Sequence, residues 1–240
     1  MIYVYAITDA DGEIPVDLCG LDGRPALSRT LSNVAIIYGE VAGPHVEPSA
    51  ENLWQHEAVV EAVMKRCEAV LPVRFGMTFG DEAALDDAVA RHTSSLVTGL
   101  ERVRGCVEMG VRVMSREAKE EATSPNSAPA DQSGRAYMLA RLEDERRRRA
   151  SQSRVEAIAD ALDAALSPLT RDGTRRLLPA PQVLLTAAYL ISRDASESFT
   201  SRARSLADAH PDVRIVCTGP WPPYHFAPSL ATRAAEVAHG

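Results

Sequence analysis

The sequence has few aromatic residues and almost no lysine. Phenylalanine, tryptophan and tyrosine make up 5% of its 240 residues, and lysine occurs only at Lys65 and Lys119, so arginine supplies nearly all of its basic charge. The hydrophobic fraction of 45% is still typical of globular proteins, so aliphatic side chains must build the core. The net charge of −7 argues against a nucleic-acid-binding protein whose affinity comes from neutralising phosphates.

Cysteine and long hydrophobic runs are also scarce. Cys19, Cys67, Cys106 and Cys217 are widely spaced and form no C-x-x-C pair, so neither a zinc site nor a disulfide framework is indicated. No apolar run is long enough to span a bilayer, and the first residues, MIYVYAI, lack the basic segment of a signal peptide. We therefore expect a cytoplasmic protein with no metal, no cofactor and no membrane segment.

Motifs of the common enzyme classes are absent. The sequence contains no G-x-G-x-x-G, Walker A, G-x-S-x-G or H-E-x-x-H pattern. His92 falls on the apolar face of a predicted helix, where a hydrogen-bonded core histidine is the simplest interpretation. No residue stands out as a general base, so we expect a protein that is not an enzyme.

What the sequence does contain is an alternation of strand and helix patterns. Strands are predicted at 1–8, 33–41, 73–79, 106–114, 182–192 and 213–217, with loop at 9–30. Helices are predicted at about 50–69, after Asp81, at about 135–166 and after Asp194. This order indicates an α+β protein with two domains, of which the first is ferredoxin-like, with a mostly antiparallel sheet and helices on one face.

The predicted domains are residues 1–104 and 105–240. The second contains a polar, proline-bearing stretch near 120–134, which we expect to be a flexible loop, and then the long helix near 135–166. In the middle of this helix, Glu143 to Glu145 precede Arg146 to Arg149, so that acid and base pair at i,i+4 in the favourable orientation. We interpret this span as solvated or partner-facing, in preference to an anion-binding or nucleic-acid-binding site.

Two short stretches containing proline carry the strongest local signals. The first is Leu71, Pro72, Val73, Arg74, Phe75 and Gly76; the second is Thr218, Gly219, Pro220, Trp221, Pro222, Pro223, Tyr224, His225 and Phe226. In the first, Arg74 interrupts an apolar strand entrance, and we expect it to reach the sheet edge or to pair with a buried carboxylate such as Glu108. In the second, the prolines fix an extended backbone and remove amide donors, as suits the exit from a strand.

The aromatic residues of the second stretch allow two roles. Because Trp221 and Tyr224 follow a buried strand ending at Cys217, we favour a stiff flap that locks the C-terminal core. On this interpretation, replacing Trp221 by alanine should cost about 3 kcal/mol of stability. The alternative is an exposed epitope for a partner, because tryptophan and tyrosine are common interface hot spots.

Together, the stretches LPVRFG and TGPWPPYHF resemble the signatures of the gas vesicle protein family GvpL/GvpF. The N-terminal MIYVYA, Glu108 and the AAYL at 187–190 occur in the matching order, so the resemblance covers essentially the whole chain. His225 stands where the family usually has a small hydroxyl residue, and Thr186 where an asparagine is common. Both departures lie outside the Gly-Pro-Trp-Pro-Pro-Tyr core of the second motif.

The resemblance implies an accessory or minor structural protein of gas vesicle formation, with a ferredoxin-like first domain and long helices in the second. It further implies binding to the hydrophobic GvpA-type shell protein and to other gas vesicle accessory proteins, with help in vesicle assembly. The two motifs are then candidate structural or partner-binding residues. Two alternatives stay open: a tandem ferredoxin-like regulatory module that binds a small ligand between its domains, and an enzyme that uses Arg74 and His92.

Overall fold

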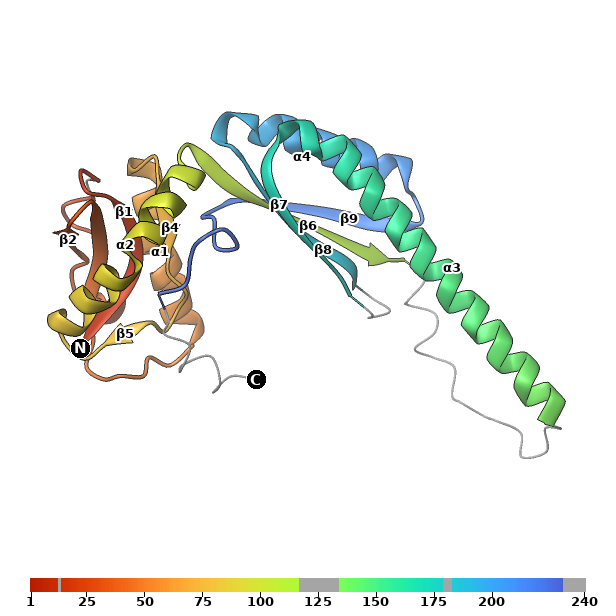
Figure 1. Cartoon of the computed structure of the whole chain (residues 1–240), viewed down its shortest axis with the longest axis horizontal. Coiled ribbons are helices and arrows are strands. Elements are labelled where there is room, and N and C mark those ends of the chain that lie inside the picture. The colour runs from red at the N-terminus through yellow and green to blue at the C-terminus, as the bar shows by residue number, and fades with distance from the viewer. Residues whose placement is uncertain (13, 117–133, 179–182, 231–240) are drawn as a thin grey trace. The chain divides into compact units, whose positions relative to one another are not determined.

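The chain forms two compact units, each built from one antiparallel sheet and its own helices (Figure 1). The computed structural model describes residues 1–12, 14–116, 134–178 and 183–230. Among the described residues, those within 1–108 and 219–230 form the first unit, and those within 109–218 form the second. The predicted two-domain α+β class is confirmed. Residues 219–230 belong to the first unit, however, whereas the predicted boundaries assigned them to the second.

The first unit is organised around a central strand that is buried on both faces. Its elements are β1 (Ile2–Asp9), η1 (Leu21–Gly23), β2 (Leu27–Leu31), β3 (Val34–Glu40), α1 (Ala50–Arg66), β4 (Val70–Pro72), β5 (Thr78–Phe79) and α2 (Glu82–Val103). The strand order is β2-β3-β1-β4, and β5 also pairs with β1. Helices α1 and α2 both pack against β1 and β4, which explains why every residue of β1 from Ile2 to Ile7 is buried.

Two predictions for this unit are wrong in detail. Of the strand predicted at 73–79, only Thr78–Phe79 (β5) is a strand, because β4 ends at Pro72 and the residues between them are not strand. Gly76 lies in this interruption with a φ of +89°, a left-handed conformation that glycine adopts without strain. The predicted loop at 9–30 contains β2, which the sequence pattern missed because this edge strand is mostly exposed and lacks an apolar run.

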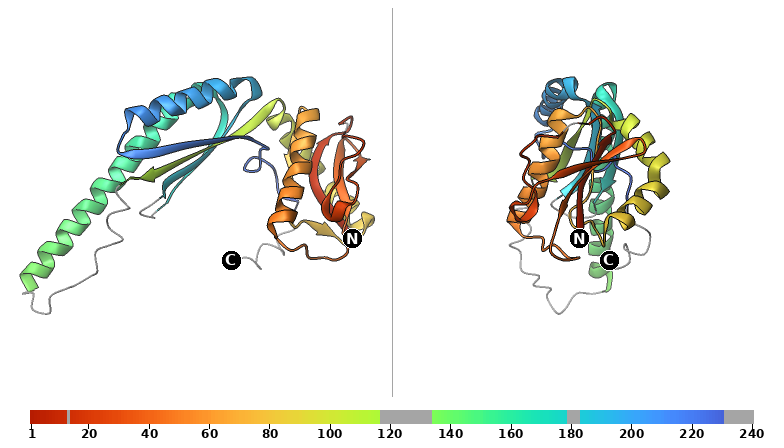
Figure 2. Two further views of the ribbon diagram at one scale, coloured as in Figure 1. Left: turned by 180° about the vertical axis from the view of Figure 1, so that it is seen from behind. Right: turned by 90° about the vertical axis from the view of Figure 1, so that its left-hand side faces the viewer.

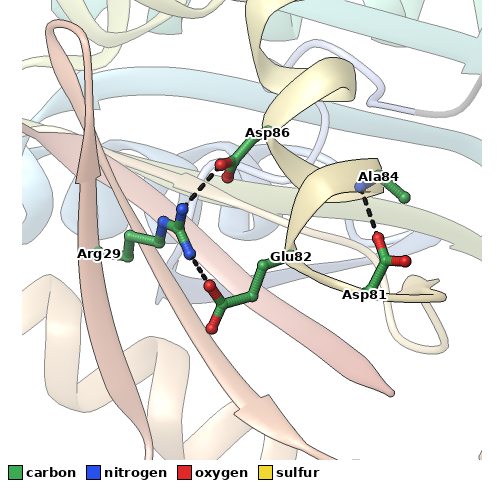
Figure 3. A network of polar contacts seen from close by, with 5 residues as sticks. All are labelled: Arg29, Asp81, Glu82, Ala84 and Asp86. Carbon is green, nitrogen blue, oxygen red and sulfur yellow. Dashed lines mark hydrogen bonds and ion pairs between the residues drawn. The ribbon is translucent and has the colours of Figure 1, made fainter.

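The start of α2 is held by a network of acidic side chains (Figure 3). Asp81 is the N-cap residue, and its side chain accepts a 2.8 Å hydrogen bond from the backbone amide of Ala84, as its position in the sequence predicted. Arg29 reaches from β2 to two carboxylates in the first turns of the helix, Glu82 and Asp86, with 2.7 Å between its Nη2 and Asp86 Oδ2. The edge strand β2 is therefore tied to the beginning of α2.

The second unit contains a long helix that packs over only part of its length. Its elements are β6 (Cys106–Ser115), which starts in the first unit, α3 (Gly134–Leu166), η4 (Ser167–Leu169), β7 (Thr170–Leu177), β8 (Val183–Ser192), η5 (Arg193–Ala195), α4 (Ser196–Ala209) and β9 (Val213–Trp221). The sheet order is β7-β8-β6-β9. The C-terminal part of α3 is buried through Ile158, Leu162 and Leu166 and contacts α4 and β8.

The N-terminal part of α3 extends beyond the sheet of its own unit (Figures 1 and 2). Tyr137, Met138, Leu139 and Leu142 are exposed there. Arg149 and Glu145 form the expected i,i+4 pair at 2.6 Å, both exposed to solvent. The long helix is confirmed, and it starts one residue before its predicted start at 135. The loop was predicted near 120–134, and residues 120–133 of that range lie outside the described part of the chain.

The Asp81 cap gives a direct test of how α2 begins. Replacing Asp81 by alanine leaves the amide of Ala84 without its side-chain acceptor, and we expect the free energy of unfolding to fall by about 1 kcal/mol. Urea unfolding of the wild type and of Asp81→Ala measures this difference. Asp87→Ala, in the next turn of the helix, serves as the control, and an equal loss in both variants would contradict the capping role.

Candidate functional site

The structure brings the two proline-containing stretches of the sequence together in the first unit. Leu71 and Pro72 are buried in β4, after which Phe75 is partly buried and Arg74 and Gly76 are exposed. Gly219, Pro220 and Trp221 are exposed at the end of strand β9, where the chain already belongs to the first unit. There Pro222 and Pro223 are buried, Tyr224 is partly buried and Phe226 is buried.

A buried histidine on α1 links the two stretches through a chain of hydrogen bonds. His56 is 1% exposed, and its Nδ1 lies 2.8 Å from the Tyr3 hydroxyl of β1. The Tyr3 oxygen also accepts a 3.1 Å hydrogen bond from the amide of Gly76 in the first stretch. On the other side of the ring, the Tyr224 hydroxyl of the second stretch lies 3.3 Å from His56 Nε2. The same hydroxyl donates a 2.8 Å hydrogen bond to Glu57.

The directions of these hydrogen bonds fix the state of the imidazole. Since the Tyr3 oxygen accepts from Gly76, its own proton is available to His56 Nδ1, and the ring proton then belongs on Nε2. Burial lowers the pKa of His56 to about 4, against the weaker opposing effect of a backbone hydrogen bond with Val73. His56 is therefore a neutral connector at physiological pH.

The hydroxyls on both sides of His56 also stay protonated. Burial is the main cause that raises the pKa of Tyr3, and burial followed by the charge of Glu57 raises the pKa of Tyr224. Each phenol keeps its proton at physiological pH and can donate it, Tyr3 to His56 and Tyr224 to Glu57. The hydrogen-bonding groups that connect the Gly76 amide with the Glu57 carboxylate therefore all have partners.

Aromatic packing surrounds the same histidine. The ring centroid of His56 lies 5.7 Å from Tyr3, 5.6 Å from Tyr5 and 5.7 Å from Phe75. The Tyr5 hydroxyl in turn accepts a 2.7 Å hydrogen bond from the amide of Leu21. Although the chain has few aromatic residues, the rings of Tyr3, Tyr5, His56 and Phe75 are concentrated around β1 and the first stretch.

Glu108 has a different partner from the one predicted. Arg74 is exposed, whereas Glu108 is 6% exposed and pairs with His225 of the second stretch. His225 Nδ1 lies 2.7 Å from Glu108 Oε1, and the amide of His225 donates a 2.9 Å hydrogen bond to Oε2. The buried carboxylate predicted for this region is present, but it holds the second stretch and not Arg74, because a backbone amide and a ring satisfy both of its oxygens.

The lock predicted at Trp221 is also corrected. Trp221 is 51% exposed, so the predicted loss of about 3 kcal/mol on truncation does not apply to it. The residues that close against the protein are its neighbours Pro222, Pro223, Tyr224 and Phe226, and they cover the first unit and not the C-terminal core. The second stretch is therefore part lock and part exposed aromatic surface.

Sequence reasoning missed Tyr3 and His56, although a signal for the histidine was present. His56 occupies the same helical face as Val59, Val60 and Val63, which are all buried, so its position in the helix indicates burial. His92 is only partly buried, and its Nδ1 lies 2.8 Å from the carbonyl oxygen of Ala88. The hydrogen bond of His92 was expected, but the side chain is not buried with the apolar face of the helix as predicted.

Among the residues that the structure describes, no cluster of three or more histidine, cysteine, aspartate or glutamate side chains is arranged to hold a metal ion. Within the same residues, no helix combines the length and the hydrophobicity that crossing a membrane would require.

The fold and this centre define a two-unit α+β protein in which a C-terminal motif closes onto the N-terminal unit. The family model for the gas vesicle synthesis protein GvpL/GvpF matches residues 1–228. The chain therefore belongs to the GvpL/GvpF family, as its sequence motifs predicted.

Relatives and solved structures agree with this assignment. Gas vesicle protein L of a Streptomyces species is 30% identical over 94% of this chain and 92% of its own length. Gas vesicle protein F2 of Halobacterium salinarum is 23% identical over 94% of this chain and 91% of its own. The crystal structure of GvpF from an Anabaena species covers 95% of both chains with a TM-score of 0.78 at 22% identity. GvpF from Microcystis aeruginosa has a TM-score of 0.74 at 19% identity, over 95% of this chain and 98% of its own.

The neutral state of His56 makes the stability of the protein depend on pH. In the unfolded chain a histidine titrates near pH 6.5, roughly its ordinary value, whereas the folded ring titrates near 4. Between these values the unfolded state binds more protons, so the free energy of unfolding falls as the pH is lowered through this window. From pH 7 to 4.5 this histidine should contribute a loss of about 2 kcal/mol.

Chemical unfolding at pH 7 and pH 4.5 measures this contribution. The carboxylates of the chain also respond to acid, so the relevant quantity is the difference between the wild type and His56→Gln. The variant should be less stable at pH 7 but should lose about 2 kcal/mol less on acidification. Parallel losses in the two proteins would show that His56 is not held neutral.

The contrast between Tyr224 and Trp221 tests which residue acts as the lock. Tyr224→Phe removes the hydroxyl that bonds to Glu57 and lies beside His56, and should cost about 1 kcal/mol of stability. Trp221→Ala removes a half-exposed side chain and should cost less than the roughly 3 kcal/mol of a buried aromatic residue. Thermal melts of the two variants check both values, and a Trp221→Ala loss of 3 kcal/mol or more would contradict the exposed position of the indole.

Proposed function

We propose that this protein is an accessory protein of gas vesicle formation that binds the hydrophobic GvpA-type shell protein and assists its assembly at the vesicle. Membership of the GvpL/GvpF family supports the general role in gas vesicle formation. The relatives described above are themselves gas vesicle proteins from a Streptomyces species and from Halobacterium salinarum.

The observation that carries this proposal is that both tryptophans of the chain are exposed. Trp54 on α1 is 76% exposed and Trp221 at the end of β9 is 51% exposed. Tryptophan is the largest apolar side chain, and in interfaces it is one of the residue types that most often supply binding energy. Their exposure in a chain otherwise poor in aromatic residues favours contact with an apolar partner.

These tryptophans are carried by two elements that the site holds together. Tyr224 lies three residues after Trp221 and bonds to Glu57, which lies three residues after Trp54 on α1. Leu53, next to Trp54, is also 41% exposed. The helix α1 fixes the backbone at Trp54, and the prolines and the Tyr224 hydrogen bond fix the backbone near Trp221. Little conformational entropy is therefore lost when a partner binds.

The partner's chemistry follows from the same surface. A shell protein that hides an apolar face in the finished wall exposes that face before it is added, and exposed apolar surface leads to aggregation. An accessory protein with indole side chains on a stable unit covers such a face and releases it again, because a few aromatic contacts provide affinity without a large interface.

Co-expression with the shell protein tests this proposal. The double variant Trp54→Ala/Trp221→Ala should keep its melting temperature within a few degrees, because both side chains are exposed. Its co-purification with the shell protein should fall by at least about tenfold, as expected when interface aromatics are removed. The matched control is Val16→Ala/Leu27→Ala, which removes two exposed apolar side chains of the same unit and should bind as the wild type does. Unchanged capture by the tryptophan variant would overturn the proposal.

A further inference from the structure

The first unit contains a surface cleft that the packing of the two motifs does not explain. It has a volume of about 440 Å³ and lies between α2 and the residues that follow Tyr224. The helix supplies Ser94, Thr98 and Arg102, which are spaced four residues apart and so share one face. Pockets for small ligands are typically roughly 300 to 1,000 Å³, so this cleft has the size of a small-molecule site.

The close approach of the C-terminal segment to α2 shapes one end of the cleft. Gly99 is buried, and a Cβ at this position would lie 3.1 Å from Pro228 Cδ and 3.2 Å from Leu71 Cδ1. The absent side chain thus lets Pro228 sit directly on the helix. Ala227 and Pro228 add an apolar wall opposite the hydroxyls of α2.

His225 is oriented toward the cleft by the buried carboxylate behind it. Glu108 engages Nδ1 and the backbone amide of His225, but it is not one of the residues that line the cleft. The other ring nitrogen, Nε2, is therefore directed away from Glu108, on a side chain that is 62% exposed.

Arg102 supplies a permanent positive charge to the cleft. Its guanidinium lies over the ring of the buried Phe226, 5.4 Å from the centroid, which fixes its position. A guanidinium matches the geometry of a phosphate, to which it can donate two parallel N–H hydrogen bonds. No acidic side chain is among the described residues that line the cleft, although acidic residues outnumber basic ones in the chain, 33 to 26.

We propose that this cleft binds a small organic phosphate. The phosphate group is held by Arg102 and the α2 hydroxyls beside the His225 ring, and the rest of the molecule lies against Ala227 and Pro228. Such a ligand would join α2 to the C-terminal segment and so stabilise the closure of the first unit. This site is independent of the exposed tryptophans, and its test does not involve the shell protein.

The test uses phenyl phosphate and inorganic phosphate as probes of the full chain, with chloride at matched ionic strength as the reference. We expect saturable binding by calorimetry, a rise in melting temperature, and tighter binding of phenyl phosphate than of inorganic phosphate because of the apolar wall. Arg102→Gln and Thr98→Glu should each weaken phenyl phosphate at least tenfold. Thr98 is exposed, so Thr98→Glu places a repelling carboxylate in the cleft without disturbing the core.

Arg66→Gln, which removes an exposed arginine on α1, is the matched control and should bind both probes as the wild type does. His225→Gln should also weaken binding. The melting temperature of this variant without ligand reports how much stability is lost with the His225–Glu108 contact. A response to phosphate that does not saturate, or that is equal to the response to chloride, overturns the proposal. So does saturable binding that persists in both Arg102→Gln and Thr98→Glu, because the anion would then be held elsewhere.

Discussion

The first unit depends on one buried, neutral imidazole that satisfies hydrogen-bonding groups from three segments distant in sequence. His56 connects Tyr3, at the start of the chain, with Tyr224, near its end, and through Tyr3 it reaches the amide of Gly76. A buried donor or acceptor that loses its partner costs roughly 1–3 kcal/mol, so none of these groups can move alone. The position of the C-terminal segment is thus set by the need to pair buried hydrogen-bonding groups as much as by the burial of apolar side chains.

The two sequence motifs acquire a physical meaning from this arrangement. The first stretch leaves β4 and turns at Gly76, which brings an amide to Tyr3. The second is stiffened by its prolines, and it places Tyr224 beside His56 and His225 on Glu108. The same rigidity holds Trp221 exposed at the edge of the site, so one segment both closes the first unit and presents an aromatic side chain to the outside.

Much of the fold was predictable from the sequence because its signals are local. Apolar residues recur with the helical period in α1, α2 and the C-terminal half of α3, because each helix buries one face. β-Branched residues are frequent in β1 and β3, because these strands are buried on both faces. The exposed edge strands β2 and β7 were missed because charged and polar side chains give no such pattern. The motifs themselves were recognised, but their partners were not: the pairing of Glu108 with His225 joins positions 117 residues apart, and no local pattern encodes it.

Hydrogen exchange tests directly whether the C-terminal segment packs on the first unit. A chain that ends at Trp221 keeps β9 whole but removes Pro222, Tyr224, His225 and Phe226. In this shortened chain, amide protection should fall in β1, α1 and the segment from Val70 to Gly76, while β8 and α4 stay protected. If protection is lost in β8 and α4 but unchanged in β1 and α1, the segment closes the second unit and not the first.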